Sequence, residues 1–568
     1  MTSITRRGFI QVAGATTSLA AAGLTATSVS AAPSSGSDGA DAGAAVSRTR
    51  QELPFGILPA DIEASAVELD PVNNFASEET YDIVVVGAGC AGVPAALTAI
   101  EEGATVGVLQ KGDFVLANGT GCSAIYQDES TLAGIQRFLY NYAELNDFRM
   151  NMPLFNYWAD HSGEMLFWLI QKVYEAGLEP ASFSTSSTIV YENGDVAALV
   201  SSSQKSNQDT MTALADLAID KGAVFHYSTP CVQLVQDASG AVIGAIGKGP
   251  DGTYIKMNAT KGVILAAGDY MNNSSLCSRY AGDIGMFWRK QTNRTGDGHI
   301  LASLAGGQIV PANHARQIHG MIPGFMTTPL LILDPRGRRF MNEGVAMTSW
   351  NTQILSHYKG TDDTTIYRFF DAAVEEKYTD LKTSLEAVNK SIDEGSTKYY
   401  TRADTLEELV EAVGLPIETA MASIERYNEL AAAGSDEDFG VVPEKLKALD
   451  TPPFYCIVDK PGLAAINGGV FVDNHYQVTT AEGEPIPHLF AAGVNAGNPC
   501  GGIDWNMPGG CSDSHCFTAG RYTAIYALTG GLEPSSPCTF EQVSDHFADE
   551  DGKFAWNNGK ARSAIEVW

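Results

Sequence analysis

The sequence of 568 residues lacks the cysteine patterns of covalent haem attachment. Its nine cysteines lie between Cys90 and Cys538, and they form neither a Cys-x-x-Cys pair nor a Cys-x-x-Cys-His motif. A covalent haem site is therefore excluded, and the odd number leaves at least one thiol without a disulfide partner in the chain. Cys500, Cys511 and Cys516 are neighbours in the sequence, although their spacing matches no ferredoxin pattern. Both an iron–sulfur centre and simple burial as small side chains remain open for these three.

Basic residues are also scarce. There are 36 Lys and Arg against 67 Asp and Glu, which gives a formal net charge of −31. This acidity argues against nucleic acid and against an anionic membrane surface as partners. It suits a basic redox partner, but a solvated acidic surface explains it as well. Beyond the N-terminal region, no apolar run reaches the roughly 18 residues of a membrane span.

The N-terminus has the features of an export signal. Arg6 and Arg7, in Thr-Arg-Arg-Gly-Phe-Ile, precede an alanine-rich, mildly apolar run and a small-residue stretch at 29–31. This order predicts a twin-arginine signal peptide over residues 1–31, followed by a linker and N-terminal extension over residues 32–79. We therefore expect a periplasmic, cell-surface or otherwise extracytoplasmic protein with no membrane span of its own.

One strand–loop–helix unit organises the rest of the chain. Residues 81–86, Tyr-Asp-Ile-Val-Val-Val, are typical of a buried parallel strand. The motif Gly87-x-Gly89-x-x-Gly92 follows, then an alanine-rich helical run and a second strand at 104–109. The three glycines permit a tight turn, close approach of a pyrophosphate and close helix packing, and the helix N-terminus stabilises phosphate charge. Because all parts occur in the required order, the sequence predicts a dinucleotide site.

Further strands and an insertion are predicted beyond this unit. Apolar strands that end in small residues at 262–268 and 489–493 are alike in composition, so they can return to one parallel sheet. The middle of the chain, about 316–463, instead contains amphipathic helices and is a candidate inserted domain. Its helices are expected at 405–413 and 417–433, and a separate hairpin is expected at 240–246 and 254–258.

Together these motifs resemble the flavoprotein subunit of fumarate reductase and succinate dehydrogenase. The resemblance includes the soluble, exported, flavocytochrome c-like relatives and the 3-ketosteroid dehydrogenases. It implies an α/β fold in which a Rossmann-like FAD-binding domain with a parallel sheet is interrupted by an inserted α+β capping domain. The implied boundaries are 80–315 and 464–530 for the FAD-binding domain, 316–463 for the cap and 531–568 for a C-terminal extension. The motifs are residues 84–92, Leu-Ala-Ala-Gly-Asp269, Thr295-Gly-Asp-Gly298, Arg339-Phe-Met-Asn-Glu343, 403–409, 425–429, 438–440, Gly468-Gly469, 489–493 and Gly509-Gly510 before Gly520-Arg521.

The resemblance implies FAD as the cofactor. We expect it to be non-covalent, because no histidine between Tyr81 and Asp160 is available for the family's covalent link. Gln110 stands where the family usually has a ribose-binding glutamate, and an amide can still accept that hydrogen bond. Ser512 and Asp513 begin the last helix, whose positive end would favour an anionic reduced flavin. The residues expected to bind the cofactor are Gly87, Gly89, Ala91, Gly92, Gln110, Lys111, Asn118, Gly119, Ser123, Ala124, Val232, Ala267, Gly268, Asp297, Gly469, Gly493, Ser512 and Asp513.

The substrate site departs from the dicarboxylate-reducing members of the family. Met347 and Met507 occupy the positions of the family's two arginines, and Ala464 and Ala465 those of its carboxylate-binding histidines. A desolvated carboxylate without these partners would be strongly disfavoured, whereas methionine forms a pliable apolar wall. We therefore expect a bulky, mostly apolar substrate with an activated C=C bond, such as a steroid, a lactone or a phenolic enoate.

Hydride transfer also requires a group that gives or takes a proton, which Met347 cannot do. By position, the candidates are His319, Tyr126, Tyr270 and Asp504. Each has a structural alternative: a hydrogen-bonded loop residue for the histidine, packing for the tyrosines and a turn for the aspartate. The residues expected to contact the substrate are Met347, Trp505, Asn506, Met507 and Ala465.

Three functions remain open at this stage. The first is an exported FAD-dependent reductase that receives electrons from a separate cytochrome or membrane redox protein. The second is the reverse reaction, a 3-ketosteroid-type dehydrogenase that introduces a C=C bond. The third is a non-catalytic, flavin-binding electron carrier, which the missing proton donor favours. The flavin potential separates the first two, and no metal site is expected.

Overall fold

The computed structural model describes residues 53–546 and 562–563, with short gaps. The gaps are residues 185–187, 286, 312–313, 320–324, 326–327, 346–349, 359–360, 362, 379–380, 382, 396–398, 498 and 500–507. The predicted export signal lies outside the described residues. No described helix is long and apolar enough to cross a membrane.

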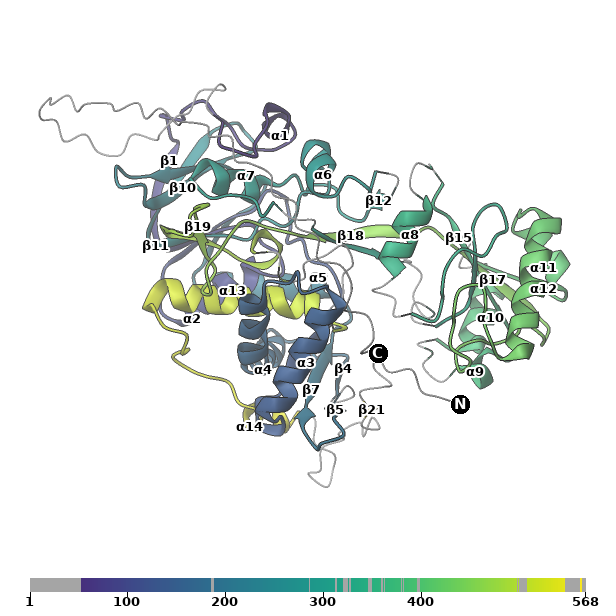
Figure 1. The fold of residues 1–568 in the computed structure, drawn as a ribbon. Helices are drawn as coiled ribbons and strands as arrows, with labels where there is room; N and C mark the ends of the chain where they lie inside the picture. Colours follow the sequence, from purple (N-terminus) through teal and green to yellow (C-terminus); the bar gives the residue numbers. More distant parts are fainter. Residues whose placement is uncertain are drawn as a thin grey trace, which may run out of the picture. The chain divides into compact units, whose positions relative to one another are not determined.

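A parallel sheet forms the centre of the fold (Figure 1). Strands β8, β2, β1, β11 and β20 are neighbours in that order and run parallel to one another, while β19, β10 and β9 add antiparallel edges. β20 follows β11 by more than 200 residues of chain, so the prediction that distant strands share one sheet is confirmed. The bounds are β1 Ser77–Val86, β2 Val106–Leu109, β8 Val224–His226, β9 Cys231–Gln236, β10 Val242–Lys248, β11 Tyr254–Leu265, β19 Gln477–Thr479 and β20 Pro485–Ala491.

The prediction of two separate strands at 254–258 and 262–268 is wrong. β11 is continuous, and its exposed polar residues Thr260 and Lys261 lie at a register shift against β1, between the pairs Tyr81–Ala259 and Ile83–Gly262. A β-bulge of this kind places extra residues in one strand without ending it. The polar pair therefore marks a bulge and not a turn.

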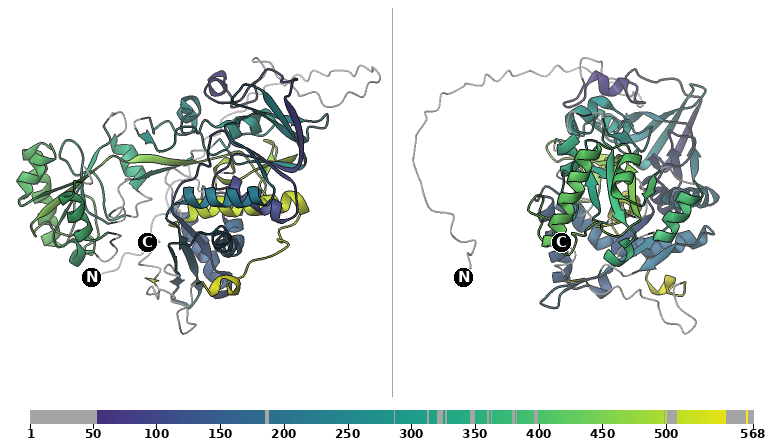
Figure 2. Two further views of the ribbon diagram at one scale, coloured as in Figure 1. Left: turned by 180° about the vertical axis from the view of Figure 1, so that it is seen from behind. Right: turned by 90° about the vertical axis from the view of Figure 1, so that its right-hand side faces the viewer.

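Helices from both ends of the chain pack beside the glycine-rich loop. α13 (yellow in Figure 1 and Figure 2) contacts α2 and α4, although its residues lie more than 300 positions away from theirs. The contact with the loop is close, because a Cβ on Gly520 would lie 2.1 Å from the Ala91 carbonyl oxygen. The helices are α1 Pro59–Glu63, α2 Gly92–Glu101, α3 Leu132–Leu145, α4 Met152–Glu175, α5 Asn207–Asp220, α6 Ser274–Tyr280, α7 Asp297–Leu304, α13 Cys511–Thr529 and α14 Glu541–Ser544.

The middle of the chain builds a second sheet with its own core. Its order is β14-β15-β17-β16, all antiparallel, and α11 and α12 pack against it (Figure 1). The helix predicted at 417–433 coincides with α12, and Thr405 caps α11 through a capping box. The bounds are β14 Leu331–Leu333, β15 Ile366–Asp371, β16 Tyr400–Ala403, β17 Phe454–Asp459, α8 Trp350–Tyr358, α9 Val374–Lys377, α10 Leu385–Asp393, α11 Leu406–Ala412 and α12 Ile417–Ala433.

Further strands of the described chain form three smaller sheets. One has the order β12-β18-β13, another β3-β7-β4 and a third β21-β5-β6. β18 begins three residues after β17 ends, so it follows directly from the second sheet. The bounds are β3 Gly121–Ile125, β4 Ser182–Ser184, β5 Ile189–Val190, β6 Val196–Ala197, β7 Leu199–Ser203, β12 Trp288–Arg289, β13 Ala315–His319, β18 Gly462–Asn467 and β21 Arg562–Ser563.

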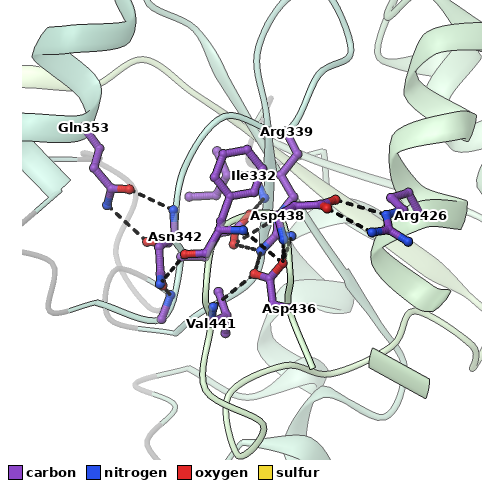
Figure 3. A network of polar contacts seen from close by, with 11 residues as sticks. Ile332, Arg339, Asn342, Gln353, Arg426, Asp436, Asp438 and Val441 are labelled. Atoms are coloured by element: carbon purple, nitrogen blue, oxygen red, sulfur yellow. Dashed lines mark hydrogen bonds and ion pairs between the residues drawn. The ribbon is translucent and has the colours of Figure 1, made fainter. Parts of the chain in front are cut away.

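A buried ion network holds the loop that follows β14 (Figure 3). The Arg339 guanidinium contacts the Glu343 and Asp436 carboxylates, each at 2.7 Å, and lies over the rings of Tyr427 and Phe439 at 5.0 and 4.8 Å. Asp436 also accepts backbone N–H bonds, and together with Arg339 these hold its pKa at about 2. Both carboxylates are buried, so each depends on Arg339 for its charge partner.

We predict that Arg339→Met destabilises the second sheet strongly. The substitution leaves two buried carboxylates unpaired, which typically costs about 3–5 kcal/mol. The thermal unfolding midpoint measured by calorimetry should fall, and the fall should be larger at pH 7 than at pH 4, where the carboxyls of the variant become protonated.

Arg426→Met is the matched control, because Arg426 pairs with Asp438 on an exposed part of α12. Exposed pairs contribute little to stability. Equal losses in the two variants would show that the Arg339 network is not a structural anchor.

Candidate active site

A cavity of about 870 Å³ lies at the carboxyl ends of the parallel strands. Its lining includes the residues that follow β1, β2, β11 and β20, together with the first turn of α13. This edge is where open parallel α/β sheets bind their ligands.

The glycine-rich loop at one side of the cavity requires its glycines. Gly87 has φ +104°, and a Cβ there would lie 2.4 Å from the Ala266 carbonyl oxygen. A Cβ on Gly92 would lie 1.8 Å from the Gly87 carbonyl oxygen. The loop is thus closed by backbone-to-backbone contact, and the N-terminus of α2 follows it, as the binding of a pyrophosphate requires.

The cavity brings together most of the residues predicted to bind the cofactor, although they come from widely separated segments. Ala465, predicted to contact the substrate, lines the same cavity. The predicted residues that line it are Gly87, Gly89, Ala91, Gln110, Lys111, Asn118, Gly119, Ser123, Ala267, Gly268, Asp297, Ala465, Gly493, Ser512 and Asp513.

Four predicted cofactor residues do not line the cavity. Gly92 and Gly469 serve backbone packing, and a Cβ on Gly469 would lie 2.5 Å from the Ala496 backbone. Val232 and Ala124 are fully buried in the protein core because side chains alternate along a strand, and their neighbours Cys231 and Ser123 line the cavity instead. At both positions the neighbouring residue lines the cavity, and the cofactor roles of Val232 and Ala124 stay predictions.

Gln110 has a structural role in the cavity wall. Its Oε1 accepts a hydrogen bond of 3.0 Å from the Ala88 N–H, and its Nε2 donates one of 2.7 Å to the Phe114 carbonyl. The amide therefore braces the glycine-rich loop against the end of β2. Beside it, Lys111 Nζ contacts Thr295 Oγ1 at 2.6 Å and Asp297 Oδ2 at 3.0 Å, so an ion pair forms part of the cavity wall.

The other part of the cavity contains Asn118, Ser123 and Asp513. Asn118 Nδ2 donates to the Ala464 carbonyl at 3.3 Å, and Ser123 Oγ donates to the Gly509 carbonyl. Asp513 Oδ2 accepts a 2.9 Å hydrogen bond from Asn207 Nδ2, and burial raises the pKa of Asp513 to about 7. A carboxyl that titrates near neutrality, inside a cavity, is typical of functional sites.

Two of the proton-donor candidates lie in the protein core. Tyr126 does not line the cavity; its ring packs against Phe167 and Phe540, at centroid distances of 5.5 and 5.8 Å. Tyr270 is fully buried, and its hydroxyl lies 2.6 Å from His314 Nδ1. Both tyrosines therefore belong to the protein core, as their structural alternative expects.

The remaining substrate and proton-donor predictions are not described by the structure. His319 ends β13 opposite Gly462, but its side chain is outside the described part of the chain. The other residues outside the described part are Met347, Asp504, Trp505, Asn506 and Met507.

The cysteines do not form a metal site among the described residues. Cys511 is buried in a core with Ile125 and Phe155, whereas Cys516 lines the cavity. No group of three metal-ligating side chains is present in the part of the chain that the structure describes, and Cys500 is outside that part.

Several lining residues were not predicted from the sequence. Lys290, Arg294 and Gln317 are among them, and so are the thiols of Cys90 and Cys122. Gln317 had one signal: in the sequence it lies two residues before the candidate His319. The position of Lys290 depends on strand pairing, which the sequence does not reveal.

A comparison with known protein families matches residues 82–512 to the FAD binding domain family. The chain belongs to this family. FAD is therefore its cofactor, and the glycine-rich loop at a helix N-terminus fits the FAD pyrophosphate. The family resemblance inferred from the motifs is confirmed, and so is the prediction of an FAD-dependent oxidoreductase acting on CH–CH or C=C groups.

Characterised relatives cover most of the chain. It is 27% identical over 494 residues to a vinyl phenol reductase of Lactiplantibacillus plantarum, an alignment that covers 80% of this chain and 97% of the relative. It is 26% identical over 470 residues to a fumarate reductase (cytochrome) of Shewanella frigidimarina, with 78% and 76% covered. The open conformation of a flavocytochrome c3 fumarate reductase superimposes with a TM-score of 0.63 at 21% identity, over 84% of this chain and 87% of that one. This superposition confirms the α/β fold with an inserted capping domain, while the exact domain boundaries remain predictions.

We predict that Gln110→Leu weakens FAD binding by about tenfold. The substitution leaves the Ala88 N–H and the Phe114 carbonyl without partners, and a hydrogen bond of this kind contributes about 1 kcal/mol. Gln110→Glu keeps an acceptor for Ala88 but loses the donor to Phe114, so its affinity should be intermediate. Fluorescence titration of FAD-free protein measures the Kd.

The control is Gln136→Leu, at an exposed position of α3. It should leave the Kd unchanged. An unchanged Kd for Gln110→Leu would contradict the bracing role of the amide.

Proposed function

We propose that the protein is an exported FAD-dependent reductase of an activated C=C bond in a bulky, mostly apolar substrate, and that dicarboxylates are not its substrates. The observation that carries this proposal is the pair Ala464 and Ala465, which line the cavity where the family resemblance places carboxylate-binding histidines. Methyl groups at these positions offer no charge to a dicarboxylate. A steroid, a lactone or a phenolic enoate is the substrate class, and the vinyl phenol reductase among the relatives supports the phenolic choice.

Two polar side chains beside these alanines can each donate a hydrogen bond to the substrate. The Lys290 N–H donates to the Leu463 carbonyl at 3.1 Å, which places Lys290 next to Ala464, and Gln317 is the register partner of Ala465. Both side chains line the cavity, and neither forms a side-chain hydrogen bond to a described residue. Their N–H donors can therefore bind the carbonyl or phenolic oxygen that activates the double bond, where charge accumulates during reduction.

Bound FAD supplies hydride transfer to or from the carbon–carbon bond. The chain's own residues hold the substrate between Ala464, Ala465, Gln317 and Lys290. We propose that FAD is held non-covalently and that electrons arrive from a separate cytochrome or membrane redox protein. Export by the twin-arginine pathway, inferred from Arg6 and Arg7, places the reaction outside the cytoplasmic membrane.

Reoxidation of the reduced flavin tests the substrate class. Dithionite-reduced protein is mixed anaerobically with phenolic enoates, lactones, steroids and fumarate, and the flavin absorbance is followed. One apolar class should reoxidise the flavin rapidly, and fumarate should not, because the cavity lacks charges for its carboxylates. Rapid reoxidation by fumarate would refute the proposal.

The same preparation distinguishes the reductase from the two alternative functions, a dehydrogenase and a non-catalytic electron carrier. If no compound reoxidises it, the oxidised protein is given saturated ketosteroids with an artificial electron acceptor. Flavin reduction in that assay would establish the dehydrogenase, and no reaction in either direction would establish the electron carrier.

We predict that Gln317→Leu lowers kcat/KM for the substrate about fivefold. The change removes a hydrogen-bond donor to the substrate oxygen, which contributes about 1 kcal/mol. Steady-state kinetics measures the effect, and Lys290→Met should act in the same direction. Lys256→Met, near the start of β11 and outside the cavity lining, is the control and should leave kcat/KM unchanged. Unchanged kinetics in both cavity variants would exclude the oxygen site.

A further inference from the structure

Asp513 is a carboxyl group built into the cavity wall. It lies in the first turn of α13 and contacts the loop that precedes β3: a Cβ on Gly119 would lie only 1.9 Å from Asp513 Oδ2. Gly119 has φ +81°, so a glycine is required there for conformation as well as for space. The packing leaves the carboxyl no room to turn away on that side.

Each carboxyl oxygen of Asp513 has a defined neighbour. Oδ2 accepts the 2.9 Å hydrogen bond from Asn207 Nδ2, at the start of α5. Oδ1 lies 3.9 Å from the Cys90 thiol, which is a weak donor. Neither neighbour is charged, and Asp513 forms no ion pair with a residue that the structure describes.

The charged and titratable groups around Asp513 come from every side of the cavity. Lys290 and Arg294 are the cations that lower its pKa, and Arg294 is shared with Asp269 in an ion pair of 3.2 Å. Burial raises the pKa of the thiols of Cys90, Cys122 and Cys516, so these stay neutral at physiological pH. The helix N-terminus favours a charge on Asp513. Desolvation outweighs the two cations and the helix N-terminus, and it raises the pKa of Asp513 to about 7.

We propose that Asp513 binds FAD in its protonated form, so that loading the cofactor takes up one proton. FAD removes the remaining water from the cavity and brings a negatively charged pyrophosphate, and both effects disfavour a carboxylate. The proton resides on Oδ1, because Oδ2 already accepts from Asn207. Oδ1–H is then available as a hydrogen-bond donor in the cavity that Asp513 lines.

This assignment fixes how the affinity for FAD changes with pH. Below the pKa of the free protein, Asp513 is already protonated and the Kd is constant. Above it, the ionised carboxyl must first take up a proton, so the Kd rises toward tenfold for each pH unit. The affinity is thus lost as the pH rises through about 7.

The test is calorimetric titration of the FAD-free full chain with FAD at pH 6 and pH 8, in two buffers with different ionisation enthalpies. The wild type should take up about one proton at pH 8 and almost none at pH 6, with Kd rising several-fold between them. Asp513→Asn keeps the shape of the side chain, and it should show neither the uptake nor the pH dependence. Asp209→Asn, on the exposed first turn of α5, should behave as the wild type does.

Three results would overturn the proposal. One is the absence of proton uptake by the wild type at pH 8, which needs no variant and no assumption about folding. Another is proton uptake by Asp513→Asn equal to that of the wild type. Infrared spectroscopy of the FAD-loaded protein at pH 8 adds a direct readout: a band of a protonated carboxyl should be present in the wild type and absent from Asp513→Asn. Its absence from the wild type would also refute the assignment.

Discussion

Backbone-to-backbone contact around the glycine-rich loop is the constraint on which the site depends. Gly92 lies against Gly87, Gly87 against the end of β11, and Gly520 of α13 against Ala91. None of these contacts tolerates a Cβ, so three segments far apart in the sequence meet at one point. The first turn of α13 is thereby placed at the cavity. Its far turns are held by Arg521, whose guanidinium contacts Glu164 of α4 at 2.6 Å.

This arrangement explains why the strand–loop–helix unit was predictable and its surroundings were not. The unit is local: periodicity and glycine spacing specify it within about 30 residues. Whether Val232 or Cys231 faces the cavity depends on the register of β9, and the continuity of β11 depends on a bulge opposite β1. Such properties arise from pairing between distant segments. The position of Lys290 beside Ala464 has the same origin, because it follows from the pairing of β12 with β18.

Tyr126 shows a different kind of failure. Its place directly after β3 suggested a flavin-side residue, but chain position does not determine which way a large ring packs. Its ring packs against Phe167 and Phe540, neither of which lines the cavity, and burying aromatic area there is favourable. The cofactor residues were predictable where backbone contact determines them. The residues for proton transfer and for substrate contact were less predictable from the sequence, since their positions depend on side-chain packing.

The charge of the cavity is the reverse of the charge of the protein. The chain carries −31 overall, yet Lys111, Lys290 and Arg294 line the cavity that receives an anionic cofactor. Salt screens exposed charges beyond a Debye length of about 8 Å. The distant acidic surface therefore contributes little to the electrostatic potential in the cavity, and the charged groups of the cavity wall determine it. Two of the acidic residues in the wall behave differently: Asp297 is paired with Lys111, while Asp513 has only neutral hydrogen-bond partners. With Asp513 neutral, Lys290 forms no ion pair with a described residue, whereas Lys111 keeps Asp297 and Arg294 keeps Asp269. The same fold that brings α13 to the loop by backbone contact therefore also sets the electrostatics of the site.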